Sequence, residues 1–344
     1  MKKKILVTGG TGYIGSHTAV ELINDGFDVI IADNLYNSEA EVADRIATIT
    51  GVRPALEVFD ICDKNRLEKF FSENSDIAAI IHFAAYKAVS ESVRKPLEYY
   101  HNNLVSLINL LDLMKRFSIP DMVFSSSCTV YGQPEKLPVT EDAPLQPAAS
   151  PYGNTKQIGE EIIRDATQAD KNIKAIALRY FNPIGAHPSA LIGELPRGVP
   201  ENLVPFITQT AYGLRDELKV FGNDYDTPDG SCIRDYLHVV DLAKAHVVAV
   251  RRLTEGKNKK NFEIFNLGTG NGVSVLEAIN SFEKVSGVKL KYRITDRRPG
   301  DIEKIWADPS FANRELGWKT QSSLDEAMKT AWEWEKKIRS KQGN

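Results

Sequence analysis

The sequence predicts an α/β protein whose first half forms a doubly wound parallel sheet. Three observations support this. Short apolar runs alternate with longer amphipathic segments through the first half, a glycine-rich loop directly follows the first apolar run, and Asp33 ends the second. Strict alternation of strands and helices is typical of parallel sheets with right-handed crossovers. We therefore expect a Rossmann-type domain followed by a smaller C-terminal α/β lobe that binds substrate.

Six apolar runs are predicted strands, because each is short and bounded by polar or turn-forming residues. They cover residues 5–7, 29–31, 56–59, 77–83, 122–124 and 176–178. The segments between them have apolar residues at helical spacing. The predicted helices cover residues 13–25, 39–49, 63–73, 96–116 and 152–169.

The alternation ends after Arg179, where Pro and Gly become frequent and the predicted elements become short. We expect residues 1–180 to form the sheet domain, including the helix at 152–169. Residues 181–344 should form mainly the substrate lobe, partly interleaved with the first domain. Helical spacing returns in three later segments. These are residues 239–253, 273–285 and 322–340. Ligands are then expected in the cleft between the two lobes.

Composition excludes several classes of function. With 43 basic and 46 acidic side chains, the net charge of -3 provides no basic field for nucleic acid or an anionic membrane. The three cysteines form no C-x-x-C pair, so neither a disulfide framework nor a metal site is expected. No apolar run approaches the ~18–20 residues that span a bilayer, and the first is shorter than the ~7–15 of an export signal. We expect a cytoplasmic protein.

The glycine-rich loop predicts a dinucleotide site. Residues 8–15 read Thr-Gly-Gly-Thr-Gly-Tyr-Ile-Gly and open a helix near Tyr13. Glycines allow a tight turn and close approach to a pyrophosphate at the helix N-terminus. Asp33 can accept hydrogen bonds from ribose hydroxyls but repels a 2′-phosphate. The sequence therefore favours NAD over NADP.

Two further strand ends support a cofactor at the same edge. Asp60 and Ile61 follow the third predicted strand, and Phe83, Ala84 and Ala85 follow the fourth. In open α/β sheets, ligands bind outside the carboxyl ends of the strands. We expect these residues to contact the cofactor.

A tyrosine and a lysine in the last helix of the first half predict acid–base chemistry. Of the 12 tyrosines, only Tyr152 has a lysine four residues later, Lys156, and this spacing puts both on one helix face. The fifth strand runs into Ser127 at its carboxyl end. A cation ~6 Å from a phenol lowers its pKa of ~10 by ~2 units at an effective dielectric of ~20. We expect Tyr152 to act as a base tuned by Lys156, and Ser127 to hold or relay the proton. The alternative is an exposed helix pair beside a capping serine run.

Taken together, these features resemble the extended short-chain dehydrogenase/reductase family, and within it the UDP-glucose 4-epimerases, from residue 4 to about 335. The resembling runs are residues 7–17, 32–35, 91–100, 179–189, 221–225, 233–239 and 297–301. The resemblance implies interconversion of UDP-glucose and UDP-galactose. Tyr152 would take the proton of the sugar 4-hydroxyl and NAD the C4 hydride. The 4-keto sugar would rotate about its link to the diphosphate, and hydride would return to its opposite face.

The resemblance also implies individual ligand contacts. Together with the strand ends above, it gives this expected cofactor set: Gly9, Gly12, Tyr13, Ile14, Gly15, Asp33, Asn34, Leu35, Asn37, Ser38, Asp60, Ile61, Phe83, Ala84, Ala85, Lys87, Asn102, Tyr152, Lys156 and Phe181. The expected UDP-sugar set is Ser127, Tyr152, Asn182, Asn202, Leu203, Phe221, Arg234, Arg298, Asp301 and Ile305. Tyr152, Lys156 and Ser127 are the expected catalytic residues.

Three residues depart from the family pattern. Cys128 follows the catalytic serine where alanine is usual, and is either a reactive thiol or an inert buried one. Ala85 stands where glycine is frequent. Ile305 occupies the position that gates the C2 substituent of the sugar, and it is neither the large aromatic nor the small residue that decides substrate range.

Related activities remain open from the sequence. A 4-epimerase for UDP-N-acetylhexosamines or UDP-glucuronate and a UDP-xylose synthase share the motifs, whereas a 4,6-dehydratase needs a carboxylate pair that Cys128 and Thr129 do not provide. A non-catalytic NAD-sensing protein is the alternative outside enzymes. We also expect a homodimer in which helices 96–116 and 152–169 pair across a two-fold axis.

Overall fold

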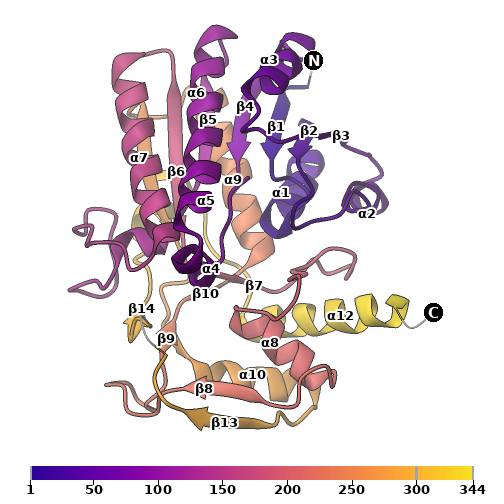
Figure 1. Cartoon of the computed structure of the whole chain (residues 1–344), viewed down its shortest axis with the longest axis vertical. Coiled ribbons are helices and arrows are strands. Elements are labelled where there is room, and N and C mark those ends of the chain that lie inside the picture. The colour runs from indigo at the N-terminus through magenta and orange to yellow at the C-terminus, as the bar shows by residue number, and fades with distance from the viewer. Residues whose placement is uncertain (1, 299–300, 343–344) are drawn as a thin grey trace.

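The computed structural model describes residues 2–298 and 301–342 and consists of a larger and a smaller lobe (Figure 1). A seven-stranded parallel sheet forms the larger lobe, in the order β11-β6-β5-β4-β1-β2-β3. The strands are β1 (Lys4–Thr8), β2 (Asp28–Asp33), β3 (Ala55–Val58), β4 (Ile77–His82), β5 (Asp121–Ser127), β6 (Lys174–Tyr180) and β11 (Phe262–Leu267). The strand order reverses between β1 and β4, which is where such sheets bind ligands. The predicted α/β doubly wound fold is confirmed.

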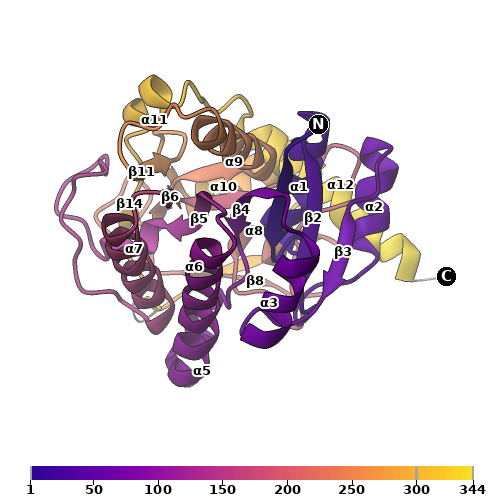
Figure 2. The same cartoon turned by 90° about the horizontal axis from the view of Figure 1, so that it is seen from above.

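Helices cover both faces of this sheet (Figure 2). One layer contains α1 (Tyr13–Asn24), α2 (Val42–Thr50) and α9 (Val239–Thr254). The other contains α3 (Lys64–Glu73), α6 (Ser106–Arg116) and α7 (Pro151–Ala169). Each layer buries its own apolar cluster against the strands, so the central strands are apolar on both sides. This explains why they occur in the sequence as continuous apolar runs.

The second half of the chain contributes directly to this sheet. All six predicted strands are present, and β11 adds a seventh by pairing in parallel with β6 from Phe262↔Ala175 to Leu267↔Tyr180. β11 was not among the strands predicted from the sequence, because Glu263 and Asn266 interrupt its apolar run. Both polar side chains are buried and paired, Glu263 with Arg252 and Asn266 with Tyr131.

The segment predicted as one helix over residues 96–116 is divided in the structure. α5 (Pro96–Tyr100) passes through a π-helical turn (His101–Val105) into α6. Asn103 in this turn accepts a hydrogen bond from the backbone N–H of Tyr86 at 2.8 Å and donates to Thr155 Oγ1 at 3.0 Å. A π-turn is often found at a functional site. Here it joins the loop after β4 to α7.

The smaller lobe packs α8, α10 and α12 around a separate apolar core that includes Ile207, Phe282 and Met328. Its helices are α8 (Leu203–Ala211), α10 (Val275–Ser286) and α12 (Leu324–Gln342), whereas α11 (Ser310–Glu315) packs on β11 of the larger lobe. Its strands are β7 (Asn182–Ile184), β8 (Leu218–Phe221), β9 (Ile233–Arg234), β10 (Tyr236–His238), β12 (Val273–Ser274), β13 (Tyr292–Thr295) and β14 (Lys304–Ile305). Two short helical segments of the larger lobe, α4 (Val89–Arg94) and the 3₁₀ turn Cys128–Tyr131, complete the described elements.

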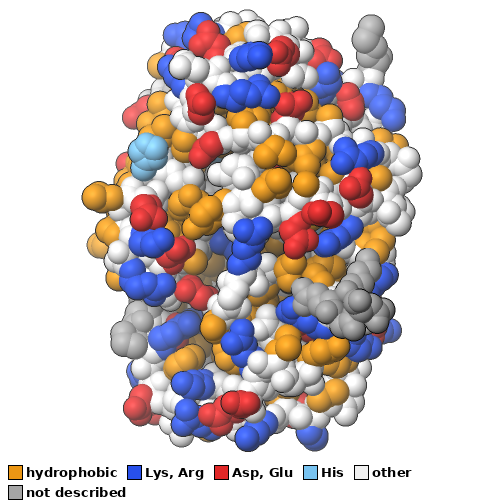
Figure 3. All heavy atoms as spheres, turned by 45° about the vertical axis from the view of Figure 1, so that its right-hand side comes forward, with side chains coloured by type: hydrophobic (Ala, Val, Ile, Leu, Met, Phe, Trp, Pro, Cys, Tyr) orange, Lys and Arg blue, Asp and Glu red, His pale blue; other side chains and the backbone are white. Residues whose placement is uncertain are grey.

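Basic and acidic side chains are interspersed on the face shown in Figure 3. Among the described residues, no helix combines the length and apolar character needed to cross a membrane. Within the same part of the chain, no three His, Cys, Asp or Glu side chains are grouped so that they could hold a metal ion. Cys62, Cys128 and Cys232 are free thiols.

Candidate active site

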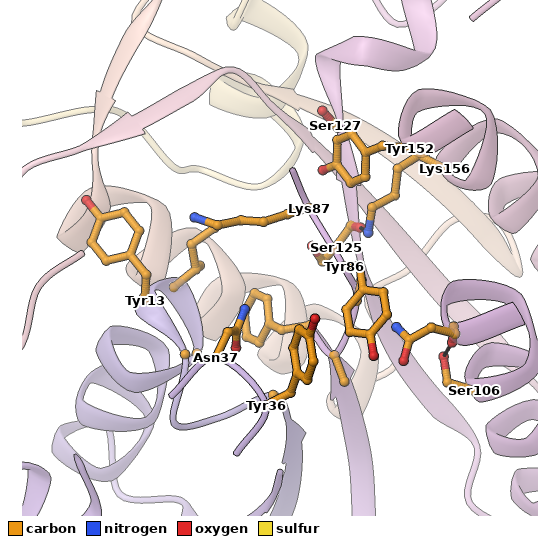
Figure 4. Close-up of a pocket in the computed structure, with 18 of the residues that line it drawn as sticks. Tyr13, Tyr36, Asn37, Tyr86, Lys87, Ser106, Ser125, Ser127, Tyr152 and Lys156 are labelled. Atoms are coloured by element: carbon orange, nitrogen blue, oxygen red, sulfur yellow. Dashed lines mark hydrogen bonds between the residues drawn. The ribbon is translucent and has the colours of Figure 1, made fainter. Parts of the chain in front are cut away.

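A cavity of about 280 Å³ lies at the carboxyl edge of the sheet, where the strand order reverses (Figure 4). It brings together most of the residues expected from the sequence. The expected cofactor residues that line it are Gly9, Gly12, Tyr13, Ile14, Gly15, Asp33, Asn34, Asn37, Asp60, Ile61, Phe83, Ala84, Ala85, Lys87, Asn102, Tyr152, Lys156 and Phe181. Of the expected substrate residues, Ser127, Asn182 and Asn202 also line it.

The glycine loop after β1 is shaped for close approach. Gly9 has a φ of +70°, and a Cβ there would lie 2.8 Å from the backbone nitrogen of Ala84. A Cβ on Gly15 would lie 2.3 Å from the carbonyl oxygen of Gly9, so only glycine lets α1 start this close to the loop. Gly12 is the N-cap of α1 and has no side chain to satisfy the first-turn N–H groups. These features fit a pyrophosphate bound at the start of α1.

Asp33 at the end of β2 is held in one orientation. Its buried carboxylate accepts hydrogen bonds from the backbone N–H groups of Thr11 at 3.1 Å and Leu35 at 2.9 Å. The hydroxyl of Ser38 lies 3.3 Å from the same carboxylate. Leu35 and Ser38 therefore fix Asp33 and do not line the cavity themselves. Asn34 and Asn37, from the same segment, do line it.

Tyr152, Lys156 and Ser127 meet on one side of the cavity (Figure 4). Lys156 Nζ donates a 2.7 Å hydrogen bond to the carbonyl oxygen of Ser125 and lies 5.9 Å from the centre of the Tyr152 ring. Ser150 caps α7 by accepting from the backbone N–H of Gly153 at 3.1 Å, which places Tyr152 in the first turn. The end of β5 supplies Ser127, so the strand and the helix aim their groups at one place.

Burial shifts the two central pKa values in opposite directions. It raises the pKa of Tyr152 to about 12, and the hydrogen bond with Ser127 only partly opposes this. Burial also lowers the pKa of Lys156 to about 8. In the protein without ligand the pKa of Tyr152 is therefore raised and not lowered as expected, because desolvation of the phenolate dominates. Ionisation of Tyr152 needs further positive charge in the cavity.

A buried ion pair holds α7 against the sheet. Glu160 lies one turn after Lys156, and its carboxylate accepts from Arg179 Nε at 2.9 Å and from Ser126 Oγ at 2.6 Å. Glu160 and Arg179 are 0% and 2% exposed. The carboxylate therefore links α7 to both β5 and β6. Tyr131 extends the network with a 2.9 Å hydrogen bond from Arg179 Nη1 to its hydroxyl.

Several residues that line the cavity were not expected from the sequence, among them Tyr36, Tyr86, Tyr180 and Glu194. The rings of Tyr36 and Tyr86 lie 4.8 Å apart, and Tyr180 hydrogen-bonds Ser125 through its hydroxyl. The three tyrosines follow or end predicted strands, so the rule applied to the other strand ends would have found them. Glu194 lies in an irregular loop and gives no such signal.

Most other expected substrate residues form a second group, in the smaller lobe. Arg298 Nη2 donates to Asp301 Oδ1 at 2.7 Å, and its guanidinium lies 5.4 Å from the centre of the Phe221 ring. Arg234 lies 3.9 Å from the same oxygen of Asp301. These four residues do not line the sheet cavity. Leu203 opens α8 beside Asn202. Pro299 and Gly300, within the resembling run 297–301, lie outside the described residues.

Of the unusual residues, Ile305 is buried and Cys128 is partly buried. Ile305 is 2% exposed and packs in an apolar cluster with Val130 and Phe181, so it does not line the cavity. Its backbone pairs with Arg234. Cys128 lines the cavity, but burial raises the pKa of its thiol to about 12. This favours the inert thiol over the reactive one, because the thiolate is the nucleophile. Ala85, the third unusual residue, also lines the cavity.

Comparison with known proteins places this geometry in a family. Residues 6–331 match the family model described as GDP-mannose 4,6 dehydratase. A UDP-glucose 4-epimerase of Bacillus subtilis is 51% identical over 331 residues, covering 96% of each chain. The structure of UDP-glucose 4-epimerase from Bifidobacterium longum with NAD+ and UDP has a TM-score of 0.93 and 46% identity, and the match covers 98% of this chain and 99% of that one. The corresponding enzyme from Stenotrophomonas maltophila, with bound NAD and formylated UDP-arabinopyranose, has a TM-score of 0.95 and 46% identity, with 98% and 99% coverage. The chain belongs to the UDP-glucose 4-epimerase family.

Proposed function

We propose that the protein interconverts UDP-glucose and UDP-galactose with NAD as a bound cofactor. The observation that carries the proposal is the meeting of Tyr152, Lys156 and Ser127 with the glycine loop and Asp33 at one sheet edge. A tyrosine base beside a dinucleotide site can oxidise and reduce a carbinol. The identity with enzymes of this name over nearly the whole chain identifies the carbinol as C4 of the hexose.

The residues around the cavity fit NAD. The carboxylate of Asp33 is fixed at the cavity wall, where it would accept hydrogen bonds from the adenosine ribose. The start of α1 offers backbone N–H groups to the pyrophosphate. Lys156, held by the Ser125 carbonyl, is placed for the nicotinamide ribose. NAD held by these residues would supply a hydride acceptor and donor for C4 of the sugar.

The acid–base step is assigned to the side chains of this chain. Tyr152 Oη takes the proton from the sugar 4-hydroxyl, and Ser127 Oγ lies on the same path as a relay. With a pKa of about 8, Lys156 is mostly charged at neutral pH, so its ammonium group favours the phenolate form of Tyr152.

The UDP part of the substrate is assigned to the smaller lobe. Arg234 and Arg298 are suited to a diphosphate, because a guanidinium binds phosphate oxygens through a planar fork. In the structure both lie beside Asp301, which keeps them within one small region. Phe221 offers a ring face close by, and Asn182 and Asn202 extend from this lobe into the cavity.

The name of the matched family model raises a second activity, dehydration. Removal of the C6 hydroxyl needs an acid and a base next to the serine that relays the proton. The two residues after Ser127 are Cys128 and Thr129, which both line the cavity and carry no carboxyl group. The thiol of Cys128 is held protonated by burial. We therefore do not assign dehydratase activity to this site.

The three free thiols also bear on location. Cys62, Cys128 and Cys232 form no disulfide in the structure. Free thiols are typical of proteins in reducing compartments. We therefore propose a cytoplasmic protein.

Incubation with UDP-galactose and no added nucleotide tests the proposal. We expect UDP-glucose to accumulate, because the cofactor is regenerated in each turnover and stays bound. Acid extraction of the purified protein should release NAD, detected by chromatography. Recovery of NADP as the main nucleotide, or a strict need for added reductant, would contradict the assignment of Asp33 and of the reaction.

Replacement of the base tests the mechanism. Tyr152→Phe should retain NAD and the melting temperature of the native protein, because the ring is kept. It should lower kcat by ~10²–10⁴-fold, the usual contribution of general acid–base catalysis. Tyr99→Phe is a matched control that loses another buried tyrosine hydroxyl, one that donates to Glu91 and lies outside the cavity lining. If Tyr152→Phe turned over at nearly the native rate, Tyr152 would not be the base.

Ile305 predicts a narrow substrate range. It lies in the apolar cluster with Phe181, which lines the cavity, and its β-branched side chain is stiff at χ1, so Phe181 has little room to give way to a larger C2 substituent such as N-acetyl. We expect UDP-N-acetylhexosamines to be poorer substrates by ~5- to 150-fold in kcat/KM, the equivalent of ~1–3 kcal/mol of overpacking. Ile305→Ala should recover much of this loss and leave UDP-galactose nearly unchanged. Equal use of both sugars by the native protein would place the gate elsewhere.

Exposed apolar side chains support the proposed homodimer. Leu97 in α5 is 81% exposed and Ile108 in α6 is 50% exposed, while Leu107 and Leu111 face the sheet. Pairing across a two-fold axis through helices 96–116 and 152–169 would cover the exposed pair. We expect a dimer mass by light scattering at micromolar concentration, and a monomer for Ile108→Asp. A monomeric native protein would refute this arrangement.

A further inference from the structure

A loop of the smaller lobe crosses the glycine loop and joins the segments on either side of it. In the sheet β1 lies between β4 and β2, so the segments that follow β4 and β2 flank the glycine loop that follows β1. Glu194 Oε1 accepts a 2.8 Å hydrogen bond from Lys87 in the loop after β4. Three residues later, Arg197 donates to the carbonyl oxygens of Tyr36 and Ser38 in the loop after β2, each at 2.7 Å.

The root of this loop is fixed to its own lobe. Gly193 packs against Trp334 of α12 so closely that a Cβ would lie 2.5 Å from the indole ring. The indole Nε1 donates to the carbonyl oxygen of Glu194 at 2.9 Å, and Asn202 Nδ2 donates to Glu194 Oε1 at 2.7 Å. Gly193 also forms a bridge with Ala186. The root is therefore held by backbone and ring packing.

The far attachments of the loop are of a different kind. Across the groove it is attached through the side chains of Glu194 and Arg197, and Arg197 is exposed to solvent. Glu194 itself lines the cavity, as do Lys87 and Asn37, the residue between the two carbonyls that Arg197 binds. A ligand at the start of α1 thus lies beneath residues 194–197.

We propose that residues 194–197 form a strap that closes the cofactor groove and sets the rate at which NAD leaves it, with Glu194 and Arg197 as its two anchors. The inference rests on the proposed function, since it takes NAD as the occupant of the groove. Neither anchor touches the reacting atoms, so both are positioning residues. Release requires the anchors to part while the root at Trp334 stays in place.

The test measures NAD release from the purified holoprotein, with alcohol dehydrogenase and ethanol converting each released NAD to NADH. Arg197→Ala should speed release by about tenfold or more, since it removes two charged hydrogen bonds and a tenfold change corresponds to ~1.4 kcal/mol. Glu194→Gln should also speed release, because the ion pair with Lys87 is lost. Arg197→Lys, which keeps a cation at this place, should give an intermediate rate.

Arg251→Ala is the matched control. Arg251 is another exposed arginine that joins the two halves of the chain through two hydrogen bonds, to Asp25 at 2.6 and 2.7 Å, but these link α9 to α1 away from the cavity. Its NAD release should stay within about twofold of the native rate. Melting temperatures of all variants, measured with NAD bound, separate loss of the strap from loss of fold.

A variant that combines Glu194→Gln with Arg197→Ala distinguishes a strap from two independent contacts. Once one anchor is lost, the strap can open. Loss of the second anchor should therefore raise the rate of NAD release by less than it does alone. If the two effects multiply, or if Arg197→Ala releases NAD at the native rate, the strap does not exist. If the native protein contains no NAD, the proposed function fails first, which the epimerase assay and acid extraction show separately.

Discussion

The buried contact between Glu160 and Arg179 is the interaction on which the site depends. It fixes α7 on the sheet one turn beyond Lys156, and through Ser126 it ties that helix to the strand that ends at Ser127. Loss of one member would leave an unpaired charge with almost no exposure, which typically costs ~3–5 kcal/mol. A base and a relay that come from different elements can stay within reach only if those elements cannot slide. The ion pair supplies that constraint.

A second constraint is the burial of the side chains of Tyr152 and Lys156. Burial raises the pKa of Tyr152 to about 12 and lowers that of Lys156 to about 8, so each group resists its charged form. The same exclusion of water strengthens every attraction that forms when a charged ligand enters. Filling the cavity with a positively charged ligand therefore favours the ionised form of Tyr152.

Much of the architecture could be predicted because its signals are local. Strand runs, helical spacing and the glycine loop all lie in adjacent residues, and Tyr152 and Lys156 are one turn apart. β11 was missed because two polar residues interrupt its apolar run, and their partners lie on other elements: Glu263 pairs with Arg252 of α9, and Asn266 pairs with Tyr131.

The site was predicted unevenly for the same reason. Residues at strand ends could be assigned from the sheet alone, whereas Glu194 lies in an irregular loop and reaches the cavity only through tertiary packing. The direction in which the Tyr152 pKa shifts could also be assigned only from the structure. Desolvation depends on every group around the phenol, whereas the sequence shows only the nearest cation.

The position of β11 has a consequence for synthesis of the chain. β6 is complete at Tyr180, but its neighbour on the outer side is Phe262–Leu267, some 80 residues later in the chain. While the chain is being made, N-terminal parts fold first, and at ~5–20 residues per second the open edge of β6 waits for several seconds. During that interval a long apolar strand presents unpaired backbone groups, the feature that leads to edge-to-edge aggregation. The interleaving that joins the lobes in the finished protein therefore makes the nascent sheet dependent on protection until the second half has emerged.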